Sequence, residues 1–251
     1  MRIVPTAPLD WNDIDLVVFD VDGTLYRQGK LRLRMLVSLL IETTRTGNWR
    51  LPKTLHTFRQ CREALGEKQT HDFMSRQYVL AARKCHCLPG EVREIVEEWM
   101  ERRPLPHLRA CRYPGIDRLF HALAGAGKTI AVLSDYPAVA KLQALDLKAD
   151  IVVAATDPEV GQLKPHPAGL RRILASTGTP PRRALMIGDR ADRDGEVARR
   201  VGMRALIRSP RLDLASGRFR TYTDAPFQPL LAQLPEPAPT PAQRHGTADA
   251  L

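Results

Sequence analysis

Short apolar runs alternate with amphipathic segments along most of this chain. The runs hold mainly Val, Ile, Leu and Ala, and they cover residues 16–19, 129–133, 151–154, 184–187 and 205–207. Helical spacing of apolar residues follows three of them, at Pro137–Leu145, Pro167–Ala175 and Gly195–Val201. Strands that alternate with helices predict crossover units, and therefore an α/β fold with a doubly wound parallel sheet. The lack of strict polar alternation fits strands buried on both faces.

The segment 30–112 has a different pattern, because its apolar residues recur at helical spacing and no run in it suggests a strand. Four helices are predicted, around Leu31–Ile41, Leu55–Leu65, Phe73–Leu80 and Val92–Met100. Pro104 and Pro106 close the segment, and Tyr113 begins the return to the sheet. We therefore predict an all-helical domain inserted between the first two strands.

This organisation divides the chain into four parts. Residues 1–29 carry the first strand and the loop after it, 30–112 the helical insert, 113–234 the rest of the sheet, and 235–251 a tail. The tail has prolines at 235, 237, 239 and 241 and almost no apolar residues, so we expect it to be disordered.

Composition and charge narrow the classes of protein that fit. Of the 251 residues, 43% are hydrophobic and 26% charged, which excludes a fibrous or wholly disordered chain. The longest aliphatic patch, Leu36–Ile41, is far short of the roughly 18 apolar residues of a membrane span, so we expect no membrane partner. The net charge is +10, and 30–112 holds 17 basic and 9 acidic residues. This excess predicts either recognition of an anion or a solvated basic face, and both remain open.

Cysteine usage and the N-terminal sequence predict a reduced, cytoplasmic location. The chain has only four cysteines, too few for a disulfide scaffold, and residues 1–15 lack the apolar core of a signal peptide. Cys85-His86-Cys87 resembles part of a metal site, but no second ligand pair follows at suitable spacing. We therefore expect these three residues to be ordinary helix-end positions.

Polar side chains follow the predicted strands at the points where the strands end. They are Asp20 and Asp22 after the first strand, Ser134 after the second, Lys164 after the third, and Asp189, Asp192 and Asp194 after the fourth. Taken singly, Ser134 is also suited to cap a helix and Lys164 to a solvated surface. Because ligands of doubly wound sheets bind beyond the carboxyl ends of the strands, we expect the set to meet in one crevice.

Clustered carboxylates repel one another unless a cation or a proton compensates. An oxygen-rich cluster suits a hard cation, and Mg²⁺ prefers carboxylates, carbonyls, waters and phosphate oxygens. Phosphoryl transfer needs its negative charge neutralised, which Mg²⁺ and Lys164 are able to do. The residue types therefore favour phosphate chemistry with Mg²⁺ as the cofactor.

Four motifs in chain order resemble those of the haloacid dehalogenase superfamily, most of whose members are phosphatases. They are Asp20-Val21-Asp22-Gly23-Thr24-Leu25, Val132-Leu133-Ser134-Asp135, Leu163-Lys164-Pro165-His166-Pro167 and Ile187-Gly188-Asp189-Arg190-Ala191-Asp192-Arg193-Asp194. The resemblance covers roughly Leu16 to Arg208 and implies a Rossmann-like core. It also places the helical insert where that family carries a cap, which opens to admit a small phosphate ester and closes over it.

The resemblance also implies a role for each motif residue. Asp20 is implied as the nucleophile that forms an aspartyl-phosphate, and Asp22 as the residue that protonates the leaving group and activates water. Phosphate binding is implied for Ser134, Lys164 and Gly23. The implied metal ligands are Asp20, the backbone carbonyl of Asp22, Asp189, and Asp194 directly or through a water. Asp192 is expected to be a surface or supporting acid.

Two features bear on which branch of the family applies. Dehalogenases and phosphonate-cleaving members resemble this chain but lack an acid at the position of Asp22, so Asp22 favours phosphate esters. Tyr26-Arg27 stands where many relatives carry Asp-Ser, and Asp135 where Asn is common. These departures remove no catalytic group, but they weaken any transfer of substrate identity.

Three functions remain in competition on the sequence alone. The first is a Mg²⁺-dependent phosphomonoester hydrolase acting on a small phosphorylated metabolite. The second is a phosphomutase or phosphotransferase, in which a substrate hydroxyl replaces water on the same aspartyl-phosphate. The third is a nucleic-acid or partner-binding module that uses the basic insert, which the complete acidic set and the 6% aromatic content disfavour.

Overall fold

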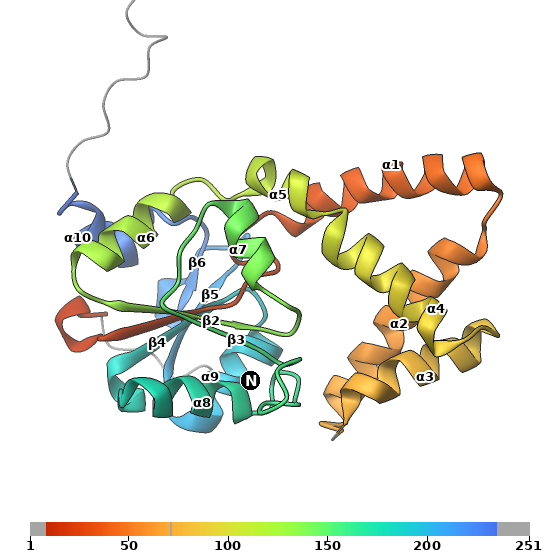
Figure 1. Cartoon of the computed structure of the whole chain (residues 1–251). Helices are drawn as coiled ribbons and strands as arrows, with labels where there is room; N and C mark the ends of the chain where they lie inside the picture. The colour runs from red at the N-terminus through yellow and green to blue at the C-terminus, as the bar shows by residue number, and fades with distance from the viewer. Residues whose placement is uncertain (1–8, 71, 235–251) are drawn as a thin grey trace, which may run out of the picture.

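The computed structural model describes residues 9–70 and 72–234, and its centre is a six-stranded parallel sheet (Figure 1). The strands are β1 (Leu16–Phe19), β2 (Thr129–Ser134), β3 (Ile151–Ala154), β4 (Ala184–Gly188), β5 (Arg204–Arg208) and β6 (Arg218–Phe219). Their order across the sheet is β3-β2-β1-β4-β5-β6. The loop after β1, residues 20–26, carries Asp20, the expected nucleophile, and is named the nucleophile loop. Its strand β1 is therefore central, with the ends of β2 and β4 on either side of it.

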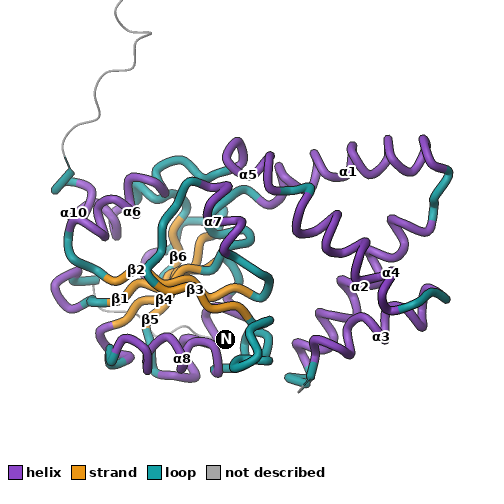
Figure 2. The backbone as a smooth tube through the Cα atoms, viewed as in Figure 1, coloured by secondary structure: helices purple, strands orange, loops and turns teal. Residues whose placement is uncertain are grey.

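Helices cover both faces of the sheet, which confirms the doubly wound α/β prediction (Figure 2). The α-helices on these two faces are α6 (Ile116–Gly125), α7 (Val139–Leu145), α8 (Ala168–Thr177), α9 (Glu196–Val201) and α10 (Gln228–Leu231). Val17 and Phe19 pack on one face with residues of α6, α7 and α10, whereas Leu16 and Val18 pack on the other with α8 and α9. Alternate residues of β1 thus serve two separate cores, as the pleat of a strand requires.

Short helical segments connect these elements. They are η1 (Trp11–Asp13), η3 (Pro181–Arg183), η4 (Ala191–Gly195), η5 (Leu214–Ser216) and η6 (Ala225–Phe227). The two-residue β6 was not predicted, since a strand of that length leaves almost no pattern in a sequence. The predicted tail, 235–251, lies outside the described residues.

The described residues between β1 and α6 form helices and loops, arranged beside the sheet (Figure 1). The helices are α1 (Gln28–Thr46), α2 (Arg50–Glu67), α3 (Phe73–Cys85), α4 (Pro89–Val96), the π-helical η2 (Glu97–Arg102) and α5 (Leu105–Cys111). The four expected helices are confirmed. Pro104 and Pro106, which the sequence places at the close of the insert, lie at the start of a further helix, α5, that was not predicted. The first turn of a helix tolerates proline, whose nitrogen carries no hydrogen to leave unpaired.

Packing within this group differs from helix to helix. Phe58 of α2, Tyr78 of α3 and Val92 of α4 are buried together, as their spacing predicts. By contrast, α1 leaves a stripe of its aliphatic side chains exposed, at Leu33, Leu36, Val37, Leu40 and Ile41. No helix among the described residues combines the length and the apolar character needed to cross a bilayer.

Candidate active site

The nucleophile loop begins where β1 ends, so the position of Asp20 is fixed by the sheet. The Asp20 amide donates to the Ile187 carbonyl of β4 over 2.9 Å, and the Asp20 side chain is buried. The hydroxyl of Thr24 donates to Asp20 Oδ2 over 2.9 Å. One carboxylate oxygen of Asp20 is thereby held by its own loop, and the other faces the neighbouring segments.

Residues from the C-terminal part of the chain hold the rest of this loop in place. Arg208 Nε donates to the Gly23 carbonyl over 2.9 Å, and the buried Tyr222 hydroxyl donates to the Thr24 carbonyl over 2.7 Å. Both partners lie about 200 residues away in sequence and reach the loop because β5 and the segment after β6 lie near β1. The loop is therefore fixed by tertiary contacts and not by its own sequence alone.

Lys164 lies at the centre of the acidic side chains. Its Nζ donates to Asp20 Oδ1 over 2.5 Å and to Asp194 Oδ1 over 2.7 Å, and also contacts the Leu133 carbonyl at 3.3 Å. The side chains of Lys164 and Asp194 are both buried. Because the lysine is surrounded by carboxylates, its pKa lies well above its usual value despite the opposing effect of burial. Lys164 is therefore a fixed positive charge in this site.

Three carboxylates come close enough to share one cation. Ligand oxygens of Asp20, Asp189 and Asp194 all lie within 4.8 Å of one another. The second oxygen of Asp194 accepts from the backbone amides of Asp189 and Arg190 over 3.2 and 3.0 Å, which closes the loop after β4. Residues from the ends of two adjacent strands thus form a single cluster of oxygen ligands.

The electrostatics of this cluster fit a divalent cation. Burial, together with the charges of Asp194 and Asp189, raises the pKa of Asp20 well above its usual value, even though Lys164 acts in the opposite direction. Burial and the neighbouring Asp194 raise the pKa of Asp189 to about 6. Crowded, buried carboxylates of this kind bind protons or a metal ion to relieve their repulsion. The donor set, all carboxylate oxygen, is the kind that Mg²⁺ prefers.

Two glycines make this close approach of segments possible. At Gly23, where φ is +97°, a Cβ atom would lie 2.2 Å from Asp189 Oδ2. At Gly188, a Cβ would lie 2.3 Å from the Asp194 side chain. Both distances are far shorter than any van der Waals contact. The glycines therefore create the space that the clustered carboxylates occupy.

The loop after β2 brings the second motif next to the nucleophile. Val132 pairs with Phe19 in the sheet, so Ser134 lies beside the start of the nucleophile loop. Ser134 Oγ accepts from the Tyr136 amide over 3.2 Å in the turn before α7, whose N-cap is Ala138, so Ser134 does not cap that helix. Asp135 Oδ1 accepts from the Lys164 amide over 2.9 Å. The acid at the position of the usual Asn thus connects the second motif to the third.

Asp22 lies outside the three-carboxylate group, because its side chain is held by two other residues. Lys141 Nζ of α7 lies 2.7 Å from each Asp22 oxygen, and the Tyr26 hydroxyl donates to Oδ1. Burial alone would raise the pKa of Asp22, but Lys141 and Tyr26 outweigh it and hold this pKa below its usual value. The side chain of Asp22 is thus arranged for a role other than cation binding.

Sequence reasoning did not find Lys141. This lysine is buried on α7, and only its position seven residues after Ser134 connects it to the second motif. Tyr26 was noticed as a departure from the family pattern, but not as a partner of Asp22. Neither contact is visible in a sequence, since both depend on how α7 lies against the nucleophile loop.

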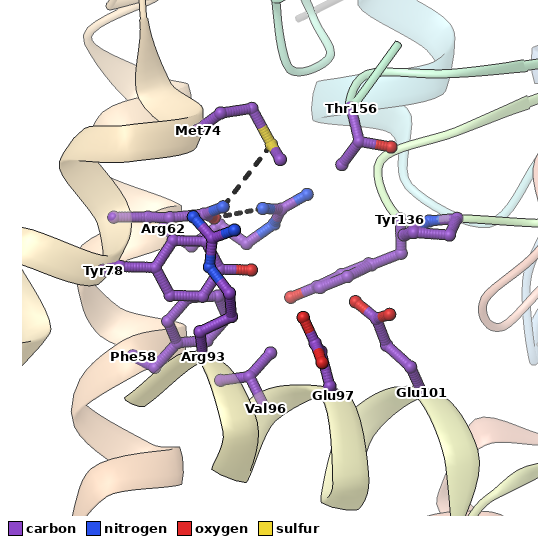
Figure 3. Close-up of a pocket in the computed structure, with 12 residues that line it drawn as sticks. Phe58, Arg62, Met74, Tyr78, Arg93, Val96, Glu97, Glu101, Tyr136 and Thr156 are labelled. Atoms are coloured by element: carbon purple, nitrogen blue, oxygen red, sulfur yellow. Dashed lines mark hydrogen bonds between the residues drawn. The ribbon is translucent and has the colours of Figure 1, made fainter. Parts of the chain in front are cut away.

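A cavity of about 160 Å³ lies between the helical insert and the loop after β2 (Figure 3). Its lining includes Arg62, Arg93, Glu97 and Glu101 of the insert, and Tyr136 of the loop. In Figure 3 the carboxylates of Glu97 and Glu101 and the ring of Tyr136 point toward one another. The cavity therefore presents both charge signs and an aromatic surface within two residues of Ser134.

Arg62 joins the insert to the core at this cavity. It is a buried residue of α2 that donates to the Asp135 carbonyl and to the Gln77 side chain. Its guanidinium lies 4.1 Å from the centre of the Tyr136 ring and 5.1 Å from that of Phe73. Such a contact combines hydrogen bonding with a cation–π interaction. Arg62 is thus one of the insert's basic residues that reach the site.

Other residues singled out in the sequence lie away from this group. The Asp192 side chain is 64% exposed and pairs with Arg190 over 2.8 Å, in keeping with a surface acid. His166 Nδ1 accepts from the Ala168 amide at the start of α8. Cys85 and Cys87 are free thiols at the end of α3, and the carboxylate group above is the cluster of metal-ligand type found in the described residues.

Comparison with known proteins agrees with this geometry. Residues 14–202 match the model of the haloacid dehalogenase-like hydrolases. Phosphoglycolate phosphatase of Rhodospirillum rubrum is 35% identical over 109 residues, which are 42% of this chain and 45% of that protein. The chain thus matches less than half the length of this curated relative.

Solved structures share the fold at low sequence identity. A 2-haloacid dehalogenase from Pseudomonas syringae has a TM-score of 0.59 at 21% identity, covering 88% of this chain and 99% of that one. A HAD-hydrolase from Bacillus subtilis, YfnB, described as bound to magnesium, has a TM-score of 0.57 at 13% identity, covering 83% and 95%. The family match over three quarters of the sequence and the shared fold lead to one conclusion: the chain belongs to the haloacid dehalogenase-like hydrolases.

Proposed function

We propose that this protein is a Mg²⁺-dependent phosphomonoester hydrolase that forms an aspartyl-phosphate on Asp20. The observation that carries the proposal is the meeting of Asp20, Asp189 and Asp194 around the buried ammonium of Lys164. This arrangement supplies a nucleophile, a cation site and a fixed positive charge within one crevice. Phosphoryl transfer depends mainly on such positioning and charge stabilisation.

In the first half of the reaction, an oxygen of Asp20 attacks phosphorus in line with the leaving group. The P–O bond to the leaving group breaks, and the side chain of Asp22 delivers a proton to the departing oxygen. In the second half, Asp22 takes a proton from water, which hydrolyses the aspartyl-phosphate and restores Asp20. Asp20 and Asp22 are held by different partners, Thr24 and Lys164 for Asp20 and Tyr26 and Lys141 for Asp22, so the two side chains are placed separately.

The remaining motif residues bind charge. Asp20, Asp189 and Asp194, with the backbone carbonyl of Asp22, would hold Mg²⁺, which neutralises phosphate charge when bound. Lys164 contributes the second positive charge, and Ser134 and the amides near Gly23 donate to the phosphate oxygens. Because Lys164 already contacts Asp20, the phosphate is expected to bind on the side of Asp20 that remains open to the loops.

The expected substrate class is based on the volume of the cavity beside Tyr136 and on the name of the curated relative. The non-phosphate part of the substrate is expected to lie in the cavity beside Tyr136, whose small volume fits a compact metabolite. Phosphoglycolate is one compound to test first, because the name of the curated relative contains it. Its carboxylate offers a partner for the Arg93 guanidinium in the cavity lining.

A screen of small phosphorylated metabolites tests the proposal. Purified protein is incubated with each compound in the presence and absence of Mg²⁺, and free phosphate is measured beside the organic product. We expect phosphate release that requires Mg²⁺ and that the Asp20→Asn variant lacks. Wild-type turnover by Asp20→Asn would rule out the proposed nucleophile. An isomerised phosphate ester in place of free phosphate would instead identify a mutase.

A further inference from the structure

Lys141 contacts both carboxylate oxygens of Asp22, the proposed acid–base residue, and no motif includes it. Its Nζ lies 2.7 Å from both oxygens of Asp22, and its side chain is only 8% exposed. A buried ammonium loses hydration unless a charged partner replaces it. The geometry of this contact is therefore tightly defined, and removal of either partner leaves the other charge buried alone.

The surroundings of Lys141 connect Asp22 to the cavity of the insert. Lys141 Nζ lies 5.2 Å from the centre of the Tyr136 ring. The guanidinium carbon of Arg62, from the insert, lies 4.1 Å from the centre of the same ring. Tyr136 lines the cavity in which the leaving group is expected to lie. The Lys141 side chain thus lies between the proposed acid–base residue and the wall of that cavity.

We propose that Lys141 is a positioning residue that holds the Asp22 carboxyl group in the orientation that faces the leaving-group oxygen. This inference rests on the proposed phosphatase function. In the step concerned, the Asp20 oxygen–phosphorus bond forms and the bond from phosphorus to the leaving oxygen breaks. Asp22 transfers a proton to the leaving oxygen, and in the second half it takes one from the water that hydrolyses the aspartyl-phosphate, so the proton count balances.

Tyr26 completes the arrangement from the opposite end of the nucleophile loop. Its hydroxyl donates to Asp22 Oδ1 and its side chain is buried. A carboxylate held by two donors from different elements cannot rotate freely about its own side-chain bonds. The pair of donors therefore restricts Asp22 to one orientation, and Lys141 is the member that contacts both of its oxygens.

Leaving-group dependence separates this role from a general structural one. Phenyl phosphate and p-nitrophenyl phosphate have nearly the same shape, but phenolate needs protonation far more than the stabilised p-nitrophenolate. The value of kcat/KM is the quantity to compare, because it reports the steps up to release of the leaving group. For Lys141→Met we expect a loss of at least about 10-fold on phenyl phosphate and less than about 3-fold on p-nitrophenyl phosphate.

Three further variants make the outcome decisive. Lys141→Arg should recover part of the lost activity on phenyl phosphate, and Lys148→Met, an exposed lysine in the same region, should match the wild type. Equal losses on both esters, or no loss, would overturn the role of Lys141.

If Asp20→Asn keeps full activity, the proposed function itself fails. If Asp20→Asn is inactive, the result for Lys141→Met stands as a test of this inference alone. Melting temperatures of all variants identify any that fail to fold.

Discussion

The nucleophile loop shows how one residue without a side chain supports a charged site. Gly23 has a positive φ of +97°, and the space beside its Cα is filled by the Asp189 carboxylate. A side chain there meets two obstacles at once, the backbone conformation and the contact. The glycine is therefore part of the proposed cation site, although it offers no side-chain ligand.

Gly23→Ala should remove most activity and destabilise the fold moderately. The left-handed conformation costs an alanine on the order of 1–3 kcal/mol, and the displaced Asp189 loses its place in the cluster. Chemical denaturation and kcat/KM measured over a range of Mg²⁺ concentrations check this. Gly29→Ala is the matched control, since a Cβ there meets nothing within 4 Å. Equal behaviour of the two variants would contradict the account.

The pKa of Asp189 gives a prediction for pH. Because its folded-state pKa is raised to about 6, above the usual value of an aspartate, the folded protein without metal binds a proton more tightly than the unfolded chain. The associated stabilisation is complete below the unfolded pKa and disappears as pH rises through about 6. Mg²⁺ competes with this proton. We expect the increase in melting temperature on Mg²⁺ addition to be larger near pH 7.5 than near about pH 5. An equal or opposite pH trend would contradict the assignment of Asp189 as a ligand.

At the scale of elements, Arg62 connects two parts of the molecule that the sheet alone does not join. Its contacts run from α2 to the loop after β2, through Asp135 and Tyr136. Since this loop follows Ser134, movement of α2 relative to the core would displace Ser134, a residue proposed to bind phosphate. Arg62 is therefore one of the contacts through which the insert affects the site.

Arg62→Met should raise KM for the best substrate about 10-fold or more and change kcat less. The methionine keeps the packing volume but loses the hydrogen bonds to Asp135 and Gln77, and such charged bonds contribute about 1.5–3 kcal/mol each. Steady-state kinetics on the substrate from the metabolite screen measure the split between KM and kcat. Arg76→Met, at an exposed position of α3, should match the wild type. A fall in kcat with KM unchanged would show that Arg62 does not position substrate.

The elements also show what a sequence is able to predict. The five longer strands and the four motifs were predictable, because apolar runs ending in polar residues carry both signals together. The helix α5 was not predicted, since its prolines, Pro104 and Pro106, are compatible with either the end or the start of a helix. Lys141 was out of reach, because its contact with Asp22 depends on the orientation of α7. The exposed stripe of α1 has the same periodicity as a packed one, so no pattern distinguishes them.

At the scale of the whole molecule, the net charge of +10 is less available than the composition suggests. In the insert, Arg45 pairs with Glu42 over 2.9 Å and Arg103 with Glu98 over 2.8 Å, while Arg62 is buried. Cations that are already paired or buried release few counterions from a nucleic acid. These three arginines therefore contribute little to the binding of a long polyanion.

Nucleic-acid binding should accordingly be weak at physiological salt. Fluorescence anisotropy with labelled single-stranded RNA and duplex DNA, at about 150 mM salt, should give dissociation constants no tighter than the non-specific range of roughly 10⁻⁴–10⁻⁶ M. Inorganic phosphate in the presence of Mg²⁺ serves as the comparison ligand. Tight binding with a steep salt dependence, in a protein that releases no phosphate from any ester, would favour a binding module over an enzyme.

The central claim is that Asp20 attacks phosphorus within the carboxylate and lysine cluster, and trapping of the covalent intermediate tests it most directly. A single turnover on the best substrate is quenched with acid, the protein is treated with borohydride or hydroxylamine, and the modified residue is located by peptide mass spectrometry. The account predicts modification at Asp20, dependent on Mg²⁺ and lost in Lys164→Met. Modification of another residue, or substrate turnover with none at Asp20, would contradict it.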